Sequence, residues 1–226
     1  MSLRIGIDLE PGIHLARALP DLDLLDVAYG AVHGGAQVIM LPVIAVVAAI
    51  PHTPAMFKRP GLPLLVLKAE ITDVDRIPAL GDDPDRIVVT GENGQCVADA
   101  AFAAEHVVRV VRSGQEVGVL CEPEAAPLKE LARAKAHWAY FSTARAYQAR
   151  SAEETQMEIA RLQSAAVAAN RLHLRVALFG PTGRHLPSAL TNVPHAEEIY
   201  PVPDLWSLAL RLGWEKAVSE FQIWLR

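Results

Sequence analysis

Charged side chains stand where several short apolar segments of this chain end. Asp8, Lys68 and Glu122 each close such a segment or follow it directly, and Glu92 follows another after a threonine and a glycine. Carboxylates and an amine that converge on one site could transfer protons or form a Schiff base with a carbonyl compound. We therefore take Asp8, Lys68, Glu92 and Glu122 as the candidate catalytic residues.

Lys68 carries the most specific signal of this set, because it interrupts the apolar run that begins at Leu64. A lysine in that position is partly desolvated, and desolvation lowers the pKa of the amine towards the nucleophilic range. In the alternative interpretation, Lys68 forms a structural ion pair with Glu92 or Asp8.

Further polar residues follow the apolar segments and are candidate substrate-binding groups: Glu70, Ser142, Thr143, Arg145, Thr182, Gly183 and Arg184. The glycine amides and Arg184 could hold a phosphate in the turn after residues 175–179. Against this, Pro181, Pro201 and Pro203 remove backbone donors from the same region. The alternative for each residue is that it is polar only because loops at the mouth of a barrel are generally polar, with no role in binding.

Neither cysteines nor histidines predict a metal or cofactor site. Cys96 and Cys121 match no disulfide framework and no zinc signature. Cys121 is expected to be a small core thiol rather than a nucleophile. The eight histidines show no ligand spacing, so we expect no metal and no cofactor.

The apolar segments are typical of buried parallel strands, being short, rich in leucine and β-branched residues, and apolar on both faces. The predicted strands are 3–7, 38–43, 64–67, 86–89, 117–121, 138–141, 175–179 and 198–202. Helical patterns alternate with them at 23–34, 73–80, 98–113, 124–134, 152–171, 186–192 and 206–222. Ser151 and Glu154 form a capping box for the longest helix.

Alternating strands and helices imply parallel pairing with right-handed crossovers. The sequence therefore predicts an α/β fold, a (β/α)8 TIM barrel, whose strand ends share one mouth. The alternative is an open doubly wound sheet, which would favour a glycine-rich phosphate turn after the first strand. Gly6-Ile7-Asp8 does not provide that turn.

Composition limits the remaining possibilities. The 226 residues are 51% apolar with a net charge of −5, which favours one globular domain over 1–226 and argues against nucleic-acid binding. No apolar run is long enough for a membrane span, and the chain begins in a strand without a signal pattern, so we expect a cytoplasmic protein. Residues 45–60 form the longest irregular segment, a loop after the second strand. Trp206, Trp214 and Trp224 are expected on one last helix, packing it against the barrel or a second subunit of a homo-oligomer.

Several of these segments, taken in order, resemble the pyridoxine 5′-phosphate synthase (PdxJ) family. Arg4–Asp8 is similar to that family's opening strand, Gly35–Ile39 to the entry to its second strand, and Asp85–Glu92 to its fourth. Residues 117–123 resemble its fifth strand, and the tail from Glu198 through Val218 its last strand and helix. The resemblance implies a TIM barrel that takes part in pyridoxine biosynthesis.

The family's functional residues do not carry over. Its second-strand histidine falls at Leu41 or Pro42, its catalytic glutamate at Lys68, and its phosphate-binding Gly-His pair at Val202-Pro203. We therefore expect a diverged member that acts on another small carbonyl or phosphorylated metabolite bound at the barrel mouth. The alternative is an inactive homologue that binds a metabolite or a partner there.

Overall fold

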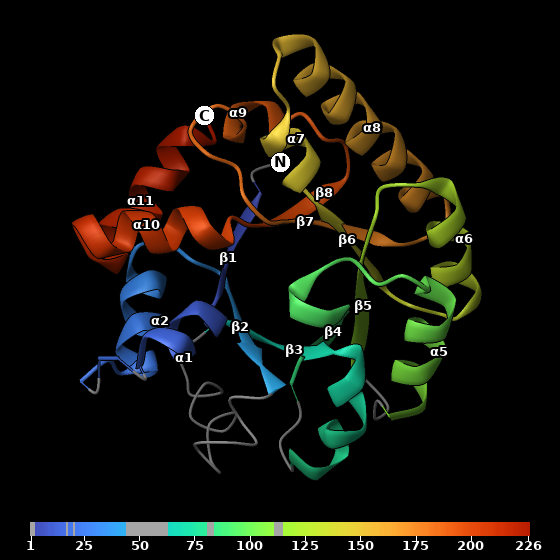
Figure 1. The fold of residues 1–226 in the computed structure, drawn as a ribbon, viewed down its shortest axis with the longest axis horizontal. Helices are drawn as coiled ribbons and strands as arrows, with labels where there is room; N and C mark the ends of the chain where they lie inside the picture. Colours follow the sequence, from blue (N-terminus) through green and yellow to red (C-terminus); the bar gives the residue numbers. More distant parts are fainter. Residues whose placement is uncertain (1–2, 17, 20, 44–62, 81–83, 111–114) are drawn as a thin grey trace.

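The protein is a closed barrel of eight parallel strands. The computed structural model describes residues 3–16, 18–19, 21–43, 63–80, 84–110 and 115–226. Each strand pairs with the next along the chain, and β1 also pairs with β8, which closes the sheet (Figure 1). The strands are β1 (Arg4–Asp8), β2 (Val38–Pro42), β3 (Leu64–Glu70), β4 (Arg86–Thr90), β5 (Glu116–Cys121), β6 (Trp138–Ser142), β7 (Arg175–Phe179) and β8 (Ala196–Tyr200). The predicted TIM barrel is confirmed, and the open sheet was the wrong alternative.

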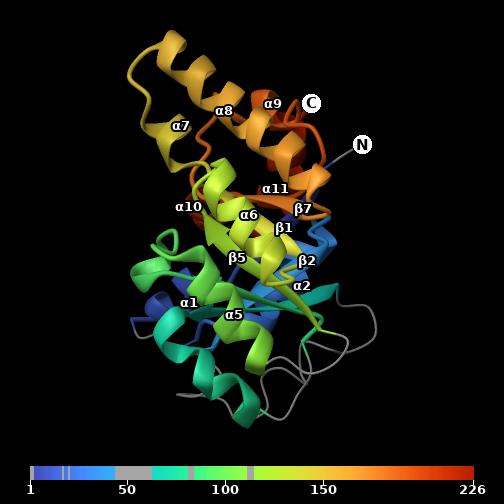
Figure 2. The ribbon, with the colours of Figure 1, turned by 90° about the vertical axis from the view of Figure 1, so that its right-hand side faces the viewer.

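Helices surround the barrel, and the chain returns through them to the start of each strand. In Figure 2, α5 lies against β5 and beside α6. On the other side of the barrel α11 packs against α2 and against α10, beside which it lies in Figure 1. The helices are α1 (Glu10–Ala16), α2 (Leu24–His33), α5 (Ala100–Val110), α6 (Ala125–Arg133), α7 (Ala144–Gln148), α8 (Ala152–Arg171), α9 (Pro187–Leu190), α10 (Val202–Leu212) and α11 (Trp214–Trp224). Two 3₁₀ helices, η1 (Ile71–Leu80) and η2 (Glu92–Gly94), follow β3 and β4.

Side chains alternate between two hydrophobic cores, as the period of a strand requires. The larger core lies between strands and helices and includes Ile5 and Ile7 of β1. The smaller core fills the barrel: Val38, Met40, Val66, Val88, Leu120, Trp138, Tyr140, Ala177 and Tyr200. Gly6 makes room for one of these rings, since a Cβ at that position would stand 2.2 Å from Tyr200 Cε1.

A buried network of charged and aromatic side chains occupies the barrel interior near the strand starts. Arg86 donates to Glu198 (2.7 and 3.3 Å) and to the Tyr140 hydroxyl (2.7 Å), and its guanidinium lies over the Trp138 ring at 3.5 Å. Glu198 is fully buried and also accepts from Tyr200 (2.7 Å) and pairs with Arg4 (2.7 Å). Charge and hydrogen-bonding capacity are therefore closely matched at this end.

The capping box predicted at the start of α8 forms in part: the Ser151 cap is present, but the return bond of Glu154 goes to the amide of the residue before the cap. Glu154 N donates to Ser151 Oγ at 3.1 Å, and the Glu154 carboxylate accepts from Arg150 N at 2.7 Å. The local pattern was sufficient here because the cap joins residues only a few positions apart.

One predicted helix is in fact two. Gly213 lies between α10 and α11 with a φ of +79°, a conformation that favours glycine and ends α10. Trp206 therefore belongs to α10, whereas Trp214 begins α11, and their rings meet edge-on at 4.6 Å. The prediction of one last helix for the tryptophans was wrong, although the packing of Trp206 into the core is confirmed.

The predicted loop 45–60 lies outside the described residues. Within the described ranges, no helix is long and apolar enough to cross a membrane.

Candidate functional site

Lys68 lies between two carboxylates at the end of the barrel where the strands finish. Its ammonium binds Asp8 Oδ2 and Glu10 Oε2, the latter at 2.5 Å. Lys68 and Asp8 are almost completely buried, whereas the Glu10 side chain is 30% exposed. Two of the predicted catalytic residues, Asp8 and Lys68, thus meet directly. The sequence-based alternative of an ion pair with Asp8 is confirmed, and the partner proposed in place of Asp8, Glu92, is exposed on η2.

Two hydrogen bonds besides the ion pair with Lys68 fix Asp8 at the end of β1. Asp8 Oδ1 accepts from Glu10 N at 2.9 Å, as a residue just before a helix commonly does. The Asp8 carbonyl oxygen accepts from Trp206 Nε1 of α10 at 2.8 Å. These bonds orient both carboxylates towards Lys68, and the Phe179 ring approaches its ammonium at 5.5 Å.

The electrostatics of Lys68 differ from the sequence-based expectation. Desolvation is the strongest single influence and by itself lowers the pKa of the amine, but the combined attraction of Asp8 and Glu10 outweighs it. The pKa of Lys68 is therefore raised above its ordinary value of 10.5, and the predicted lowering was wrong in direction. Burial raises the pKa of the Asp8 carboxyl above 3.8, because lost hydration outweighs the pull of Lys68. Lys68 is consequently an ammonium ion at neutral pH.

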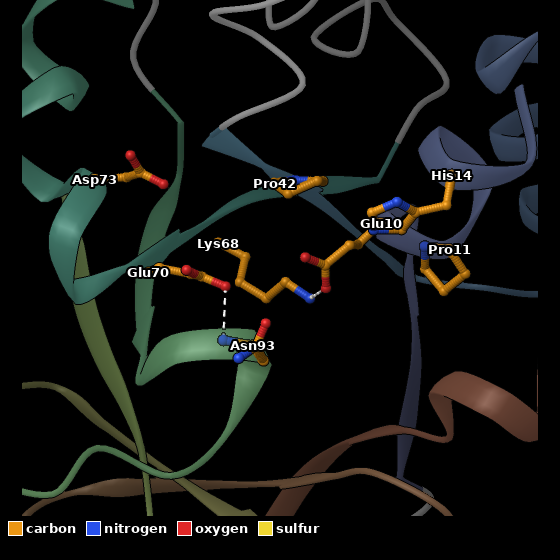
Figure 3. Close-up of a pocket in the computed structure, with 8 residues that line it drawn as sticks. All are labelled: Glu10, Pro11, His14, Pro42, Lys68, Glu70, Asp73 and Asn93. Atoms are coloured by element: carbon orange, nitrogen blue, oxygen red, sulfur yellow. Dashed lines mark hydrogen bonds and ion pairs between the residues drawn. The ribbon is translucent and has the colours of Figure 1, made fainter. Parts of the chain in front are cut away.

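A cavity of about 420 Å³ opens beside this triad of Asp8, Lys68 and Glu10. Figure 3 shows Lys68 extending from β3 towards Glu10, while the backbone of Asn93 donates to Glu70 at 2.8 Å. Most of the lining residues are polar or charged, although most of the surface that they present to the cavity is apolar: Glu10, Pro11, His14, Pro42, Lys68, Glu70, Asp73 and Asn93. The cavity is thus placed to bring a small polar molecule against the lysine.

Thr90, at the end of β4, is a candidate that sequence reasoning missed. It is 1% exposed, and its hydroxyl has no hydrogen-bond partner among the described residues. It pairs in register with Glu70 and stands two positions after Val88, so strand alternation turns it into the barrel. A buried hydroxyl without a partner is rare and is often completed by water or ligand. Only the strand position could have signalled it.

Glu122 belongs to a separate cluster. It pairs with Arg145 at 3.4 Å and with Arg161 of α8 at 3.1 Å, and Arg161 also binds Glu124 and Glu158. Sequence reasoning missed Arg161 because it lies far along the chain within a regular helix. The catalytic roles of Glu92 and Glu122 stay predictions.

The remaining predicted binding residues are already bonded within the fold. Asp204 of α10 accepts from the backbone amides of Thr182 (2.6 Å) and Gly183 (3.1 Å) and from the Thr182 hydroxyl (3.0 Å). The Arg184 guanidinium lies over Trp224 at 5.3 Å.

Two further members of the predicted set lie at the end of β6. Thr143 is buried and donates to the Pro181 carbonyl at 2.8 Å, and Ser142 Oγ accepts from Ala144 N at 3.3 Å. Ser142 therefore supports the turn into α7, and Thr143 joins that turn to the loop after β7; the role of both towards substrate stays a prediction.

The cysteines are poor nucleophiles. Burial raises the pKa of Cys96 to about 12, and it raises that of the fully buried Cys121 further still. The expectation of an inert core thiol at Cys121 agrees with this. In the described part of the chain, no three His, Cys, Asp or Glu side chains are grouped to hold a metal ion.

Comparison with known proteins gives matches to solved structures and none by sequence. No family model matches the chain, and no curated protein matches it. Orotidine 5′-monophosphate decarboxylase from Methanocaldococcus jannaschii, solved with the inhibitor BMP, superimposes with a TM-score of 0.66 at 11% identity over 100% of both chains. KGPDC from Streptococcus mutans, solved in complex with a ligand, gives 0.63 at 12% identity over 99% of this chain and 97% of that one. A 4-hydroxy-2-oxoglutarate/2-dehydro-3-deoxyphosphogluconate aldolase from TTHB1 gives 0.57 at 15% identity, covering 98% and 94%.

These likenesses show the TIM-barrel fold. They also overturn the resemblance to pyridoxine 5′-phosphate synthase, because the similar structures belong to a different group of TIM barrels. The place in pyridoxine biosynthesis that the resemblance implied is therefore not supported either. The matching segments were strand entries and strand ends, which every barrel of this kind needs, so their shared order reflected the fold rather than a family.

Proposed function

We propose that this protein is an enzyme that acts on a small carbonyl metabolite bound in the cavity beside Lys68. The observation that carries the proposal is the charged amine, held by two carboxylates, at the wall of a cavity with several charged lining residues, on the side where TIM-barrel enzymes have their active sites. A solvent-exposed lysine without such partners would not indicate an active site.

The triad suits proton transfer next to a carbonyl group. Glu10, the exposed carboxylate, takes a proton from the carbon beside the carbonyl, and the C–H electron pair forms the C=C bond of an enolate. The carbonyl π electrons move to oxygen, where the Lys68 ammonium stabilises the negative charge by a hydrogen bond. Return of a proton to the same carbon restores the carbonyl compound and completes a hydrogen exchange, with no other reactant consumed.

In this scheme Asp8 is a positioning residue. It touches Lys68 and the backbone of Glu10, and it has no place in the cavity lining. Its carboxylate holds Lys68 in the charged form that an enolate oxygen requires.

A Schiff base is less suited to this geometry. It needs a neutral amine, whereas the pKa of Lys68 is raised and two carboxylates occupy its hydrogens. We therefore expect no reduction product at Lys68 when borohydride is added with carbonyl compounds.

The test is hydrogen exchange in D₂O, followed by proton NMR. Small aldehydes, ketones and 2-oxo acids would be incubated with the wild type, with Lys68→Met, and with Lys216→Met as a control at an exposed lysine. The wild type and the control should exchange the hydrogen beside the carbonyl of at least one compound, and Lys68→Met should lose the activity by about 10²-fold or more.

The proposal fails if the folded wild type exchanges none of these compounds, or if Lys68→Met exchanges them equally well. Absence of exchange together with tight binding of a carbonyl compound would instead favour the alternative of a binding protein without turnover.

A further inference from the structure

The turn after β7 carries the usual parts of an anion site, but the chain fills that site itself. Successive amides of Thr182 and Gly183 point at one acceptor, as in the backbone nests that bind phosphate. The acceptor is the Asp204 carboxylate, which uses one oxygen for each amide and takes the Thr182 hydroxyl as well. All three donors are thus committed to an internal anion.

The turn after β8 offers few backbone amide donors for an anion. The first turn of α10 contains Pro203, which has no amide hydrogen, and Pro201 precedes the helix. Asp204 stands in the same turn and brings a negative charge to the end of the helix that would otherwise attract an anion. The loops after strands seven and eight, a common phosphate position in TIM barrels, therefore repel a second anion here.

The cavity has the same electrostatic character. Glu10, Glu70 and Asp73 line it, and Lys68 faces them as the cation among its lining residues. Lys68 is itself neutralised by Asp8 and Glu10. Asp73 pairs with Arg76 at 3.0 Å, but that arginine is 54% exposed and the pair is screened by solvent. A dianionic group would enter against a local excess of negative charge.

We propose that the substrate of this site carries no phosphate and is an uncharged or amine-bearing carbonyl compound, with Asp204 as the residue that excludes the phosphorylated forms. This rests on the proposed function for the carbonyl group, but the exclusion of phosphate stands on the Asp204 contacts. The structural neighbour named for orotidine 5′-monophosphate acts on a phosphorylated compound, and this chain differs from it in that respect.

The first experiment measures binding of inorganic phosphate, independently of any turnover. Thermal unfolding and amide NMR shifts would be recorded for the wild type in phosphate and in chloride of matched ionic strength. The variants are Asp204→Ala, Asp204→Asn, which keeps one acceptor oxygen, and Asp26→Ala, an exposed acid on α2 with the same change of charge.

Phosphate should leave the wild type and Asp26→Ala unchanged, and it should bind Asp204→Ala at least about tenfold more tightly, a difference of about 1.4 kcal/mol. Asp204→Asn should lie between them. The inference is overturned if phosphate stabilises the wild type with shifts at Thr182 and Gly183. It is equally overturned if neither Asp204 variant, once folded, gains phosphate binding.

The second experiment compares matched substrates in the D₂O exchange assay, such as glyceraldehyde and dihydroxyacetone with their phosphates. The wild type should exchange the unphosphorylated member of each pair faster. Faster exchange of the phosphorylated members would overturn the inference while leaving the proposed function intact. Absence of all exchange would contradict the proposed function alone, because the phosphate-binding experiment would still decide the role of Asp204.

Discussion

The two ends of the barrel interior both hold buried charge, but they balance it differently. Near the strand starts, Arg86 and Glu198 satisfy each other and are completed by tyrosine hydroxyls, Arg4 and a tryptophan face. At the strand ends, Lys68 pairs with two carboxylates, and the hydroxyl of Thr90 has no hydrogen-bond partner among the described residues.

This difference distinguishes buried charges that stabilise the fold from buried charges that can take part in a reaction. A network in which donors and acceptors match gains nothing from a ligand, so it serves stability and specificity of packing. A triad with one surplus carboxylate beside a cavity can exchange protons with whatever enters. The comparison predicts that substitutions at the first end affect folding, whereas substitutions at the second affect activity.

The largest effect on stability is expected for Arg86→Met. It removes the buried cation that Glu198 and Tyr140 share and leaves Glu198 with Arg4 as its cation, so we expect a loss of about 3–5 kcal/mol in the free energy of unfolding. Urea titration followed by circular dichroism measures this. Arg133→Met, at an exposed arginine paired with Glu130, is the control and should change stability by less than about 0.5 kcal/mol. Equal effects of the two substitutions would remove the structural role given to Arg86.

Lys68→Met should lose less stability than Arg86→Met and more activity. Asp8 can take up a proton, since burial already raises its pKa, so the loss of stability should be about 1–3 kcal/mol. The exchange activity should nevertheless fall by about 10²-fold or more. If Lys68→Met destabilised the protein as much as Arg86→Met did and left the exchange rate per folded molecule intact, the contrast between the two ends would be lost.

Alkaline pH should weaken the contribution of the strand-end triad to stability. The folded pKa of Lys68 lies above 10.5, so its contribution to stability is fully present below that value and is lost as pH rises through the folded pKa. Wild-type stability should therefore decline above about pH 10.5 more steeply than that of Lys68→Met. Parallel pH profiles, measured by urea unfolding, would show that the triad does not hold the ammonium in the folded state.

The smallest effect on stability is expected for Thr90→Val. Exchange of an unpartnered buried hydroxyl for a methyl group should change the free energy of unfolding by less than about 1 kcal/mol. Turnover of a substrate that bonds to Thr90 should fall about tenfold.

Thr143→Val is the matched control, since its buried hydroxyl donates to the Pro181 carbonyl; it should cost about 1–3 kcal/mol. A larger loss of stability at Thr90 than at Thr143 would mean that the Thr90 hydroxyl has a structural role.

Most of the fold could be predicted because its signals are local. The predicted strands overlap all eight observed strands, and the predicted helix 152–171 coincides with α8. The helix α1 was missed, since Glu10, Pro11 and Gly12 resemble a turn and Asp8 supplies the cap. Gly213 was missed as a break because the apolar period continues on both sides of it.

The site was less predictable, since it depends on which distant residues share an environment. Asp8 and Lys68 could be placed at strand ends, but Glu10 was not selected and Glu92 was assigned a role near Lys68 that Glu10 fills. The expected direction of the Lys68 pKa rested on burial alone, which lowers it, and the attraction of Asp8 and Glu10 together reversed that direction.

The sequence by itself determined the barrel, because alternating apolar strands and helices with these lengths can bury their faces in few other ways. It also determined that acids and a lysine stand at strand ends. Only the tertiary structure decided that Glu10 joins Asp8 at Lys68, that Thr90 lacks a partner among the described residues and that Asp204 fills the turn after β7. The physical reason is that pairing of charges across a barrel depends on orientation and burial, which no local pattern of residues records.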